Sequence, residues 1–200
     1  GGSAGFHRII EIGIVRMRAG EIIDEWSSLV NPGTRIPTAI EAFTGITGAM
    51  VADAPRFADL ADEVRGRLEG RLFVAHNARF DYGFLRREYQ SLGQTFRSRL
   101  LCSVRLSRRL HPDERGHSLD AVMARHGLDC SARHRALGDA RVVADFLRVM
   151  CRSQDPARLG AVVAELTRGA TLPPTVDPEL AEELPETPGV YRFWGEGDAL

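Results

Sequence analysis

The sequence predicts an α/β domain with a mixed sheet, and three observations lead to this fold class. Residues 9–17 and 21–30 are rich in β-branched and apolar side chains, which predicts an antiparallel hairpin. Short apolar segments then alternate with amphipathic helical segments, as in α/β proteins. The composition, 44% hydrophobic and 26% charged, is typical of a globular protein, and 200 residues suffice for one domain and part of a second.

Turn and breaker residues delimit the first elements. Gly20 separates the two hairpin strands, and Asn31-Pro32-Gly33 ends the second strand. Residues 36–47 predict a loop or a short helix. The next helix is expected to begin at Asp53 and Pro55 and to run to about Leu68, with Gly70 as its C-cap.

The central part of the chain predicts a buried strand followed by a helix. Residues 71–75 form a short apolar run, and His76-Asn77 ends it. In the helix after this strand, four apolar side chains are expected to point inward: Phe80, Phe84, Leu85 and Leu92. The later elements are expected to be a short strand at 99–102 and helices at 104–110, 118–126, 134–150 and 157–167.

Charge is unevenly distributed although the net charge is only −1. Residues 177–200 hold seven acids and one arginine, so the rest of the chain is positive, which permits a polyanionic substrate. The helix at 104–110 is unusually rich in arginine, with Arg105, Arg108 and Arg109. A solvated helix face is at least as good an interpretation of these three residues as a DNA contact.

The cysteines and the hydropathy profile predict a cytoplasmic protein. Cys102, Cys130 and Cys151 are odd in number and lack the CxxC spacing of a zinc site, so we expect reduced thiols. No apolar run approaches the roughly 20 residues that cross a bilayer, so no membrane partner is expected.

A histidine and an acid meet where the helix at 134–150 begins. Asp139 precedes Val142 and Val143 by three and four residues, so it opens the apolar stripe of that helix. A carboxylate placed there is costly unless it meets a cation, a donor or a metal. His134 lies about 140° away around an ideal helix, so the two side chains converge only if His134 sits on the entering turn. Alone, the pair is more typical of capping or helix-dipole residues than of chemistry.

A second carboxylate strengthens the catalytic interpretation. Asp81 precedes Phe84 and Leu85 by three and four residues, so a second helix also begins its apolar stripe with an acid. The carboxyl ends of strands are where α/β proteins build active sites. Converging carboxylate oxygens suit Mg²⁺ or Mn²⁺ better than zinc. With a histidine nearby, this pattern favours metal-assisted hydrolysis of phosphodiesters.

Several motifs, in order and at familiar separations, resemble those of a known family. They are Ile9-Ile10-Glu11-Ile12-Gly13, Leu29-Val30-Asn31-Pro32, Phe43-Thr44-Gly45-Ile46-Thr47, His76-Asn77-Ala78-Arg79-Phe80-Asp81 and His134 to Asp139-Ala140. Over residues 1–152 the chain resembles the DEDDh 3′–5′ exonucleases, specifically the proofreading epsilon subunit of bacterial DNA polymerase III and its relatives. The resemblance implies a ribonuclease-H-like fold and removal of nucleotides from a 3′ end with two metal ions.

The resemblance also implies roles for five residues. Asp139 and Asp81 correspond to metal-binding acids, and His134 to the general base that deprotonates the attacking water. Ile46 corresponds to a residue that contacts the terminal base and Asn77 to one that braces the site, although packing and a turn explain these two nearly as well. Expected partners are the single-stranded 3′ end of DNA and, by resemblance only, a DNA polymerase or repair complex.

Both ends of the chain depart from the family pattern. The family's first motif is an acid-x-acid pair on a central strand, whereas Gly1-Gly2-Ser3 matches the residues that come directly after that motif. We therefore expect the exonuclease domain, 1–152, to lack its first strand, and Glu11 to be a framework residue and not a substitute acid. After a helix and Pro/Glu-rich linker at 153–183, residues 184–200 resemble the opening strand of a GIY-YIG endonuclease domain, with Tyr191 as a catalytic residue.

Three functional hypotheses arise from these observations. The first is a metal-dependent 3′–5′ DNA exonuclease in proofreading or repair, with the given 200 residues themselves inactive because two acids are missing. The second is a non-catalytic exonuclease-like module that binds nucleic acid or serves as a scaffold. The third is an exonuclease that trims RNA.

Overall fold

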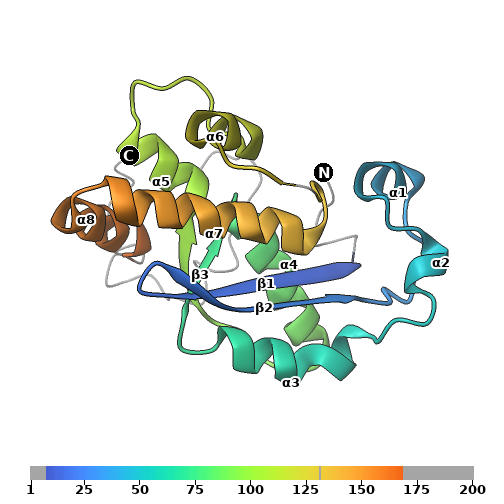
Figure 1. The fold of residues 1–200 in the computed structure, drawn as a ribbon. Helices are drawn as coiled ribbons and strands as arrows, with labels where there is room; N and C mark the ends of the chain where they lie inside the picture. The colour runs from blue at the N-terminus through green and yellow to red at the C-terminus, as the bar shows by residue number, and fades with distance from the viewer. Residues whose placement is uncertain (1–7, 131, 169–200) are drawn as a thin grey trace, which may run out of the picture. The chain divides into compact units, whose positions relative to one another are not determined.

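The computed structural model describes residues 8–130 and 132–168, which belong to one compact unit. Along this part of the chain a pair of strands comes first, and helices precede, separate and follow the two later strands (Figure 1). In chain order, the elements are β1 (Glu11–Arg18), β2 (Glu21–Leu29), α1 (Thr38–Thr44), α2 (Gly48–Val51), α3 (Phe57–Leu68), β3 (Leu72–Ala75), α4 (Ala78–Ser91), β4 (Arg99–Cys102), α5 (Ser103–Leu110), α6 (Leu119–His126), α7 (Ala136–Ser153) and α8 (Pro156–Thr167).

The strands form an antiparallel pair and a parallel pair. β1 and β2 are joined in the expected hairpin, with an irregularity in register between Arg16 and Met17. β3 runs parallel to β4, and the last residues of the two strands, Ala75 and Cys102, lie opposite each other. The mixed strand directions agree with the predicted α/β class, but they occur in two separate two-stranded sheets among the described residues, not in one sheet.

Helices α7 and α3 lie on opposite sides of the hairpin (Figure 1). The approach of α7 to β1 is very close at Gly13, where a Cβ atom would lie 2.2 Å from the backbone nitrogen of Leu137. Only glycine leaves room for the helix backbone at this point of the strand. The close approach fixes where the first turn of α7 lies above the hairpin.

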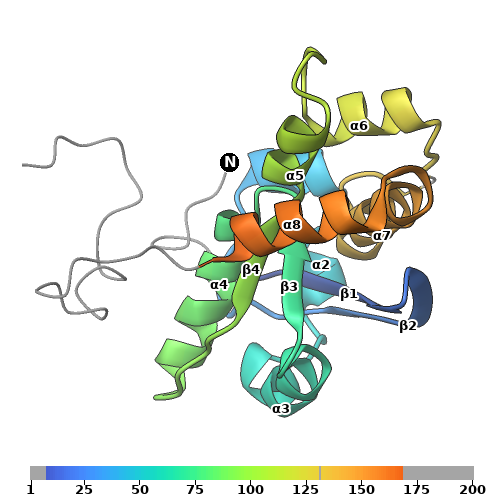
Figure 2. The same cartoon turned by 90° about the vertical axis from the view of Figure 1, so that its left-hand side faces the viewer.

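Two large apolar clusters hold the helices to the strands. The first joins the hairpin to α3 and α4 through residues that include Ile12, Val64 and Tyr89. The second joins β4 to α5, α6, α7 and α8, and Phe146 and Val162 are among its members. Helix α8 therefore packs within the compact unit, which continues to Arg168, beyond the boundary expected near residue 152. The second view shows α8 crossing in front of β3 and β4 (Figure 2).

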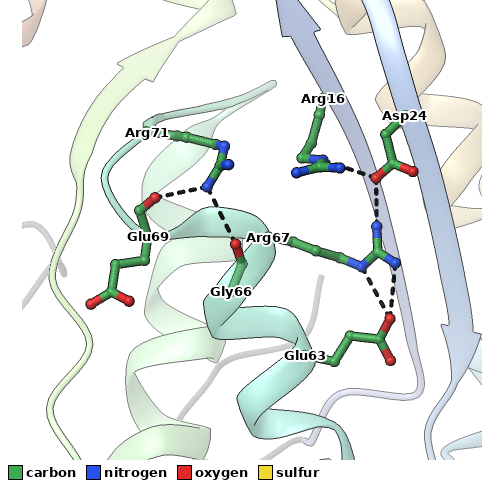
Figure 3. Close-up of polar contacts among 7 residues, drawn as sticks. All are labelled: Arg16, Asp24, Glu63, Gly66, Arg67, Glu69 and Arg71. Atoms are coloured by element: carbon green, nitrogen blue, oxygen red, sulfur yellow. Dashed lines mark hydrogen bonds and ion pairs between the residues drawn. The ribbon is translucent and has the colours of Figure 1, made fainter.

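An ion-pair network ties the hairpin to α3 (Figure 3). Asp24 of β2 accepts hydrogen bonds from Arg16 of β1 at 2.9 Å and from Arg67 of α3 at 2.5 Å. Arg67 also bonds to Glu63 one turn earlier on the same helix. Because these side chains are partly exposed, the network orients α3 more than it stabilises the fold.

The structure corrects three expectations about helix boundaries and faces. Helix α3 begins at Phe57, not at Asp53 or Pro55, because the Asp59 carboxylate accepts a hydrogen bond from the Arg56 backbone nitrogen and caps the helix there. Phe80 and Leu92 were expected to point inward, yet both are exposed. Phe80 packs beside Phe84 on the outer surface of α4, and Leu92 lies just beyond the end of this helix.

Two predictions fall on residues outside the described ranges. The endonuclease-like strand at 184–200, with Tyr191, and residues 169–183 of the segment expected as helix and linker lie there, so these parts remain predictions. Among the helices of 8–130 and 132–168, none combines the length and the apolar character that a membrane span needs.

Candidate active site

Glu11 holds the start of α7 against β1. Its carboxylate accepts hydrogen bonds from Arg135 Nη2 at 2.6 Å and from the backbone nitrogen of Ala136 at 2.7 Å. A negative charge is favourable at a helix N-terminus, where backbone N–H groups are unpaired. The framework role expected for Glu11 agrees with these contacts, since they determine where the first turn of α7 begins.

The segment entering α7 folds back over the first turn of the helix. A Cβ atom on Gly138 would lie 2.1 Å from the carbonyl oxygen of Ala132, so glycine permits this close approach. His134 adopts a left-handed backbone conformation, with φ of 63°, and its backbone nitrogen donates to Asp139 Oδ1 at 3.3 Å. Helix α7 begins at Ala136, not at His134, so His134 lies on the entering turn, which is the condition for its convergence with Asp139.

Asp139 lies in the first turn of α7 and meets a cation. Its carboxylate accepts a hydrogen bond from the guanidinium of Arg133, which also binds Asp120 of α6 at 2.8 Å. The Arg133 guanidinium thus lies between Asp139 and Asp120 and offsets the repulsion of their charges. The half-buried Asp139 therefore has the cationic partner that its place on the helix requires.

Asp81 lies in the first turn of α4, and the charge of Asp139 affects its pKa. By surface area Asp81 is exposed, yet protein atoms crowd its carboxyl, and this burial raises the pKa of Asp81 to about 6. The negative charge of Asp139 acts in the same direction. The two carboxylates, 58 positions apart in the sequence, are therefore brought near each other by the fold.

The raised pKa of Asp81 predicts a pH dependence of stability. The folded state holds the proton more tightly than the unfolded chain, whose carboxyl has a pKa of 3.8, so the stabilising contribution is present at low pH and is lost as the pH rises through about 6. Asp81→Asn mimics the protonated carboxyl. Its free energy of unfolding, measured with urea, is expected to exceed that of the wild type increasingly between pH 4 and pH 6. A difference that stays constant with pH would contradict the assigned shift.

The carboxyl ends of β3 and β4 lead directly into this region. His76 follows β3, and its Nδ1 lies 2.9 Å from Ser103 Oγ, at the start of α5. Burial lowers the pKa of His76, and the nearby charges of Arg133 and Asp139 affect it in opposite directions. Helices α4, α5 and α7 therefore all begin at the edge where the parallel strands end, as expected for an α/β active site.

The structure gives different placements to the two residues expected to contact substrate. Ile46 is only 1% exposed and packs with Ile36 and Val51, in agreement with the packing alternative. Its contact with a terminal base stays a prediction. Asn77 is exposed and takes a left-handed conformation, with φ of 68°, at the start of α4. Its backbone serves the turn, and the described contacts include no capping bond from its side chain.

Phe43 is a candidate site residue that the sequence interpretation missed. Its ring lies 4.2 Å from the ring of His134, measured between centroids, and 61% of the residue is exposed. It belongs to the Phe43-Thr44-Gly45-Ile46-Thr47 motif, in which the substrate contact was expected from Ile46. Burial decides between Phe43 and Ile46, and burial depends on tertiary packing.

Arg133 and Asp120 were also missed. Arg133 lies next to His134 in the sequence, and this adjacency was the only available signal. Asp120 lies in the first turn of α6, where an acid is ordinary because it favours the helix dipole. The bridge between the two depends on how α6 packs against α7.

The side chains present are of the kind that a hard divalent cation binds, but too few of them converge to form a complete site. Asp81 and Asp139 supply carboxylate oxygens, the donors that Mg²⁺ and Mn²⁺ prefer. Their mutual repulsion, reflected in the raised pKa of Asp81, is the situation that a bound cation relieves. Within residues 8–130 and 132–168, however, no group of three or more His, Cys, Asp or Glu side chains is placed to hold a metal.

Comparison with known proteins identifies similar sequences and structures. The Exonuclease (RNase_T) family matches residues 1–147. A DNA polymerase III subunit epsilon-like protein of Rhodobacter capsulatus is 40% identical over 178 residues, which cover 84% of this chain and 25% of that protein. A PolC-type DNA polymerase III of Clostridium perfringens is 35% identical over 141 residues, which cover 70% of this chain and 10% of the polymerase. The chain thus spans a quarter or less of these two relatives.

Solved structures show the same fold. Exonuclease X, in complex with 5′ overhanging duplex DNA, superposes with a TM-score of 0.65 and 29% identity, over 83% of this chain and 95% of that one. The nuclease domain of 3′hExo, a DEDDh family member bound to rAMP, gives a TM-score of 0.62 at 20% identity, over 72% and 81% of the two chains, and supports the fold alone. With its α/β architecture and the match over residues 1–147, the chain belongs to the Exonuclease (RNase_T) family.

Proposed function

We propose that this chain carries part of the active site of a metal-dependent 3′–5′ exonuclease that acts on single-stranded 3′ ends of DNA. One observation carries the proposal: Asp81 and Asp139 lie in the first turns of two separate helices, α4 and α7, and burial together with the charge of Asp139 raises the pKa of Asp81 to about 6. A histidine precedes Asp139 on a turn that bonds to it. Two close carboxylates beside a histidine suit hydrolysis of a phosphodiester.

Asp139 and Asp81 would bind divalent cations in this site. The Asp139 carboxylate would hold the ion that carries the attacking water, and Asp81 would contribute to a second site. Such ions, when bound, supply positive charge to the phosphate and make a coordinated water more acidic. Arg133, which binds Asp139 here, would compete with an incoming cation for this carboxylate.

His134 would remove a proton from the attacking water. Its left-handed turn directs the ring toward Phe43 of α1, which packs against one part of it. This contact limits the positions of the imidazole while a ring nitrogen accepts the proton. The exposed face of Phe43 would also offer a surface on which a terminal base can stack.

The names of the relatives support DNA over RNA as the substrate, and the DNA polymerase III names support a role in proofreading. The two relatives described above are a DNA polymerase III and an epsilon-like protein, and Exonuclease X was solved with DNA. The polymerase names also support association with a DNA polymerase, whereas association with a repair complex and a role in repair stay predictions. Incubation of the full-length protein and Mg²⁺ with 5′-labelled DNA and RNA strands tests the proposal. A ladder of shortened DNA is expected, and an unchanged DNA strand would contradict it.

The 200-residue chain by itself is expected to bind Mn²⁺ weakly and to cleave DNA poorly. The reason is that a Mg²⁺ or Mn²⁺ site needs several oxygen donors. Among the described residues, no group of three or more His, Cys, Asp or Glu side chains is placed to hold a metal, and Asp81 and Asp139 supply only two carboxylates. Isothermal titration calorimetry measures the affinity. Tight binding of Mn²⁺ to this chain would contradict the expectation and show that the described donors suffice.

Removing Arg133 is expected to strengthen Mn²⁺ binding. The Arg133 guanidinium competes with the cation for the Asp139 carboxylate, and a partly exposed ion pair contributes at most about 1 kcal/mol. Arg133→Gln should therefore improve the affinity by up to about fivefold. Arg141→Gln is the matched control, since Arg141 lies on the same helix as Asp139 but binds Glu25 of the hairpin. Equal affinities in the two variants would show that Arg133 does not compete with the metal.

A further inference from the structure

The first turn of α5 lies beside the first turn of α4. Ala75 and Cys102 pair at the ends of the parallel strands, and Ser103 Oγ bonds to His76 just before α4. Burial would raise the pKa of the Cys102 thiol, but it is lowered overall because backbone N–H groups donate to the sulfur. These groups come from both helix starts: Arg105 and Val104 of α5, and Ala78 and Asn77 of α4. Helix α5 therefore begins next to the turn that carries Asp81.

The exposed face of α5 is formed by arginines. Arg105, Arg108 and Arg109 follow a spacing of three and four residues, which places them on one side of the helix. The opposite side is buried and consists of Ser103, Leu106, Ser107 and Leu110. Arg109 forms an ion pair with Glu165 of α8 at 3.2 Å. No contact of Arg105 or Arg108 with a carboxylate occurs within the part of the chain that the structure describes.

This arrangement differs from that of several other arginines of the described residues, which pair with acids. Arg133 and Arg135 are each neutralised by an acid, as are Arg16, Arg67, Arg141 and Arg148. Like charges three residues apart on a helix repel each other, so Arg105 and Arg108 do not help the helix to fold. Two exposed guanidiniums close to a carboxylate site are better explained by an anionic partner outside the protein.

We propose that Arg105 and Arg108 bind backbone phosphates of the nucleic-acid strand whose 3′ end enters the site at Asp81 and Asp139. This inference rests on the proposed function, and it adds the path that the strand takes away from the cleavage site. Arg105 is nearer to that site, and Arg108 lies farther along α5, about 4.5 Å away in helical rise. The long side chains reach successive phosphates, and the fork of each guanidinium suits phosphate oxygens.

Salt dependence of DNA binding tests this path. The probe is a fluorescein-labelled single-stranded DNA oligonucleotide, and anisotropy measures its affinity for the 200-residue chain over a range of NaCl concentrations. Each phosphate contact to single-stranded DNA contributes about 0.7 to the slope of log K against log salt. Arg105→Gln with Arg108→Gln is therefore expected to reduce the slope by about 1.4.

A matched double variant controls for net charge. Arg71 and Arg99 are exposed and lie at the ends of β3 and β4 that face away from the candidate site. The Arg71 guanidinium bonds to the carbonyl oxygens of Gly66 and Glu69, not to a carboxylate (Figure 3). Arg71→Gln with Arg99→Gln removes the same charge and is expected to leave the slope within about 0.3 of the wild type. Circular dichroism melts verify that both double variants are folded.

Three results would overturn the inference: equal slope reductions in the two double variants, no reduction in the α5 variant, or no binding of the oligonucleotide by the wild type at low salt. Failure of the proposed function is a separate result. If the full-length protein binds DNA with the expected slopes but does not shorten it, the path along α5 stands and the catalytic proposal fails. If it shortens DNA while the α5 variant keeps its slope, only the path fails.

Discussion

Asp139→Asn is expected to reduce DNA trimming by the full-length protein by about two to three orders of magnitude, the loss typical when one preorganised electrostatic group is removed from an active site. The asparagine keeps the shape of the side chain and can still accept hydrogen bonds from Arg133 and from the His134 backbone. It lacks the negative charge that a divalent cation requires. The effect should therefore appear in kcat and in Mn²⁺ affinity, not in folding.

The control for this variant lies on the same helix. Asp145→Asn makes the same chemical change two turns later, where the carboxylate pairs with Arg148 instead of facing the site. Its trimming rate is expected to match that of the wild type. Trimming is measured as shortening of a 5′-labelled strand in Mg²⁺, with thermal melts to compare folding. Retained trimming in Asp139→Asn would remove this residue from the proposed site.

Gly13→Ala is expected to destabilise the chain by about 1–3 kcal/mol, the usual cost of overpacking. The added Cβ would lie 2.2 Å from Leu137 N and 2.4 Å from Ala136 C, and both are backbone atoms that no side-chain rotation can move away. Relief requires α7 to shift from β1. Because Asp139 lies in the first turn of α7, the shift would also displace the candidate site.

Gly66→Ala provides a control of opposite sign. Gly66 lies within α3, and no atom within 4 Å would meet an added Cβ. Alanine is the better helix former, so a stability gain of about 0.5–1 kcal/mol is expected. Urea denaturation of the two variants measures both changes. A Gly13→Ala variant as stable as the wild type would show that α7 does not pack against β1 as closely as described.

Local sequence patterns were sufficient for most of the secondary structure. The hairpin at β1 and β2, the apolar strand β3 and the helix α7 were all predicted within about two residues, because turn residues and hydrophobic periodicity act over short distances. The start of α3 was misplaced, since Asp59 caps the helix from inside its first turn. Phe80 was assigned inward by periodicity, which gives the spacing of a helix face but not what covers it.

The candidate site was predictable only in part. Asp81, His134 and Asp139 could be selected because each stands where a helix begins, and acids at the start of an apolar stripe are unusual. Two contacts could not be predicted, because each joins elements that no local rule relates. They are the Arg133 bridge from Asp139 to Asp120 and the contact of Phe43 with His134. A substrate contact was expected from Ile46, whereas Phe43 is the exposed residue of the same motif.

The sequence by itself determined the family, the order of the elements and the three residues most suited to chemistry. These depend on residue types and spacings, which are properties of the chain alone. Tertiary structure decided which groups meet: Glu11 with the start of α7, Arg133 with two acids, and α5 with the turn that carries Asp81. The physical reason is that burial and charge pairing depend on distances in space, and packing sets those distances between residues far apart in sequence.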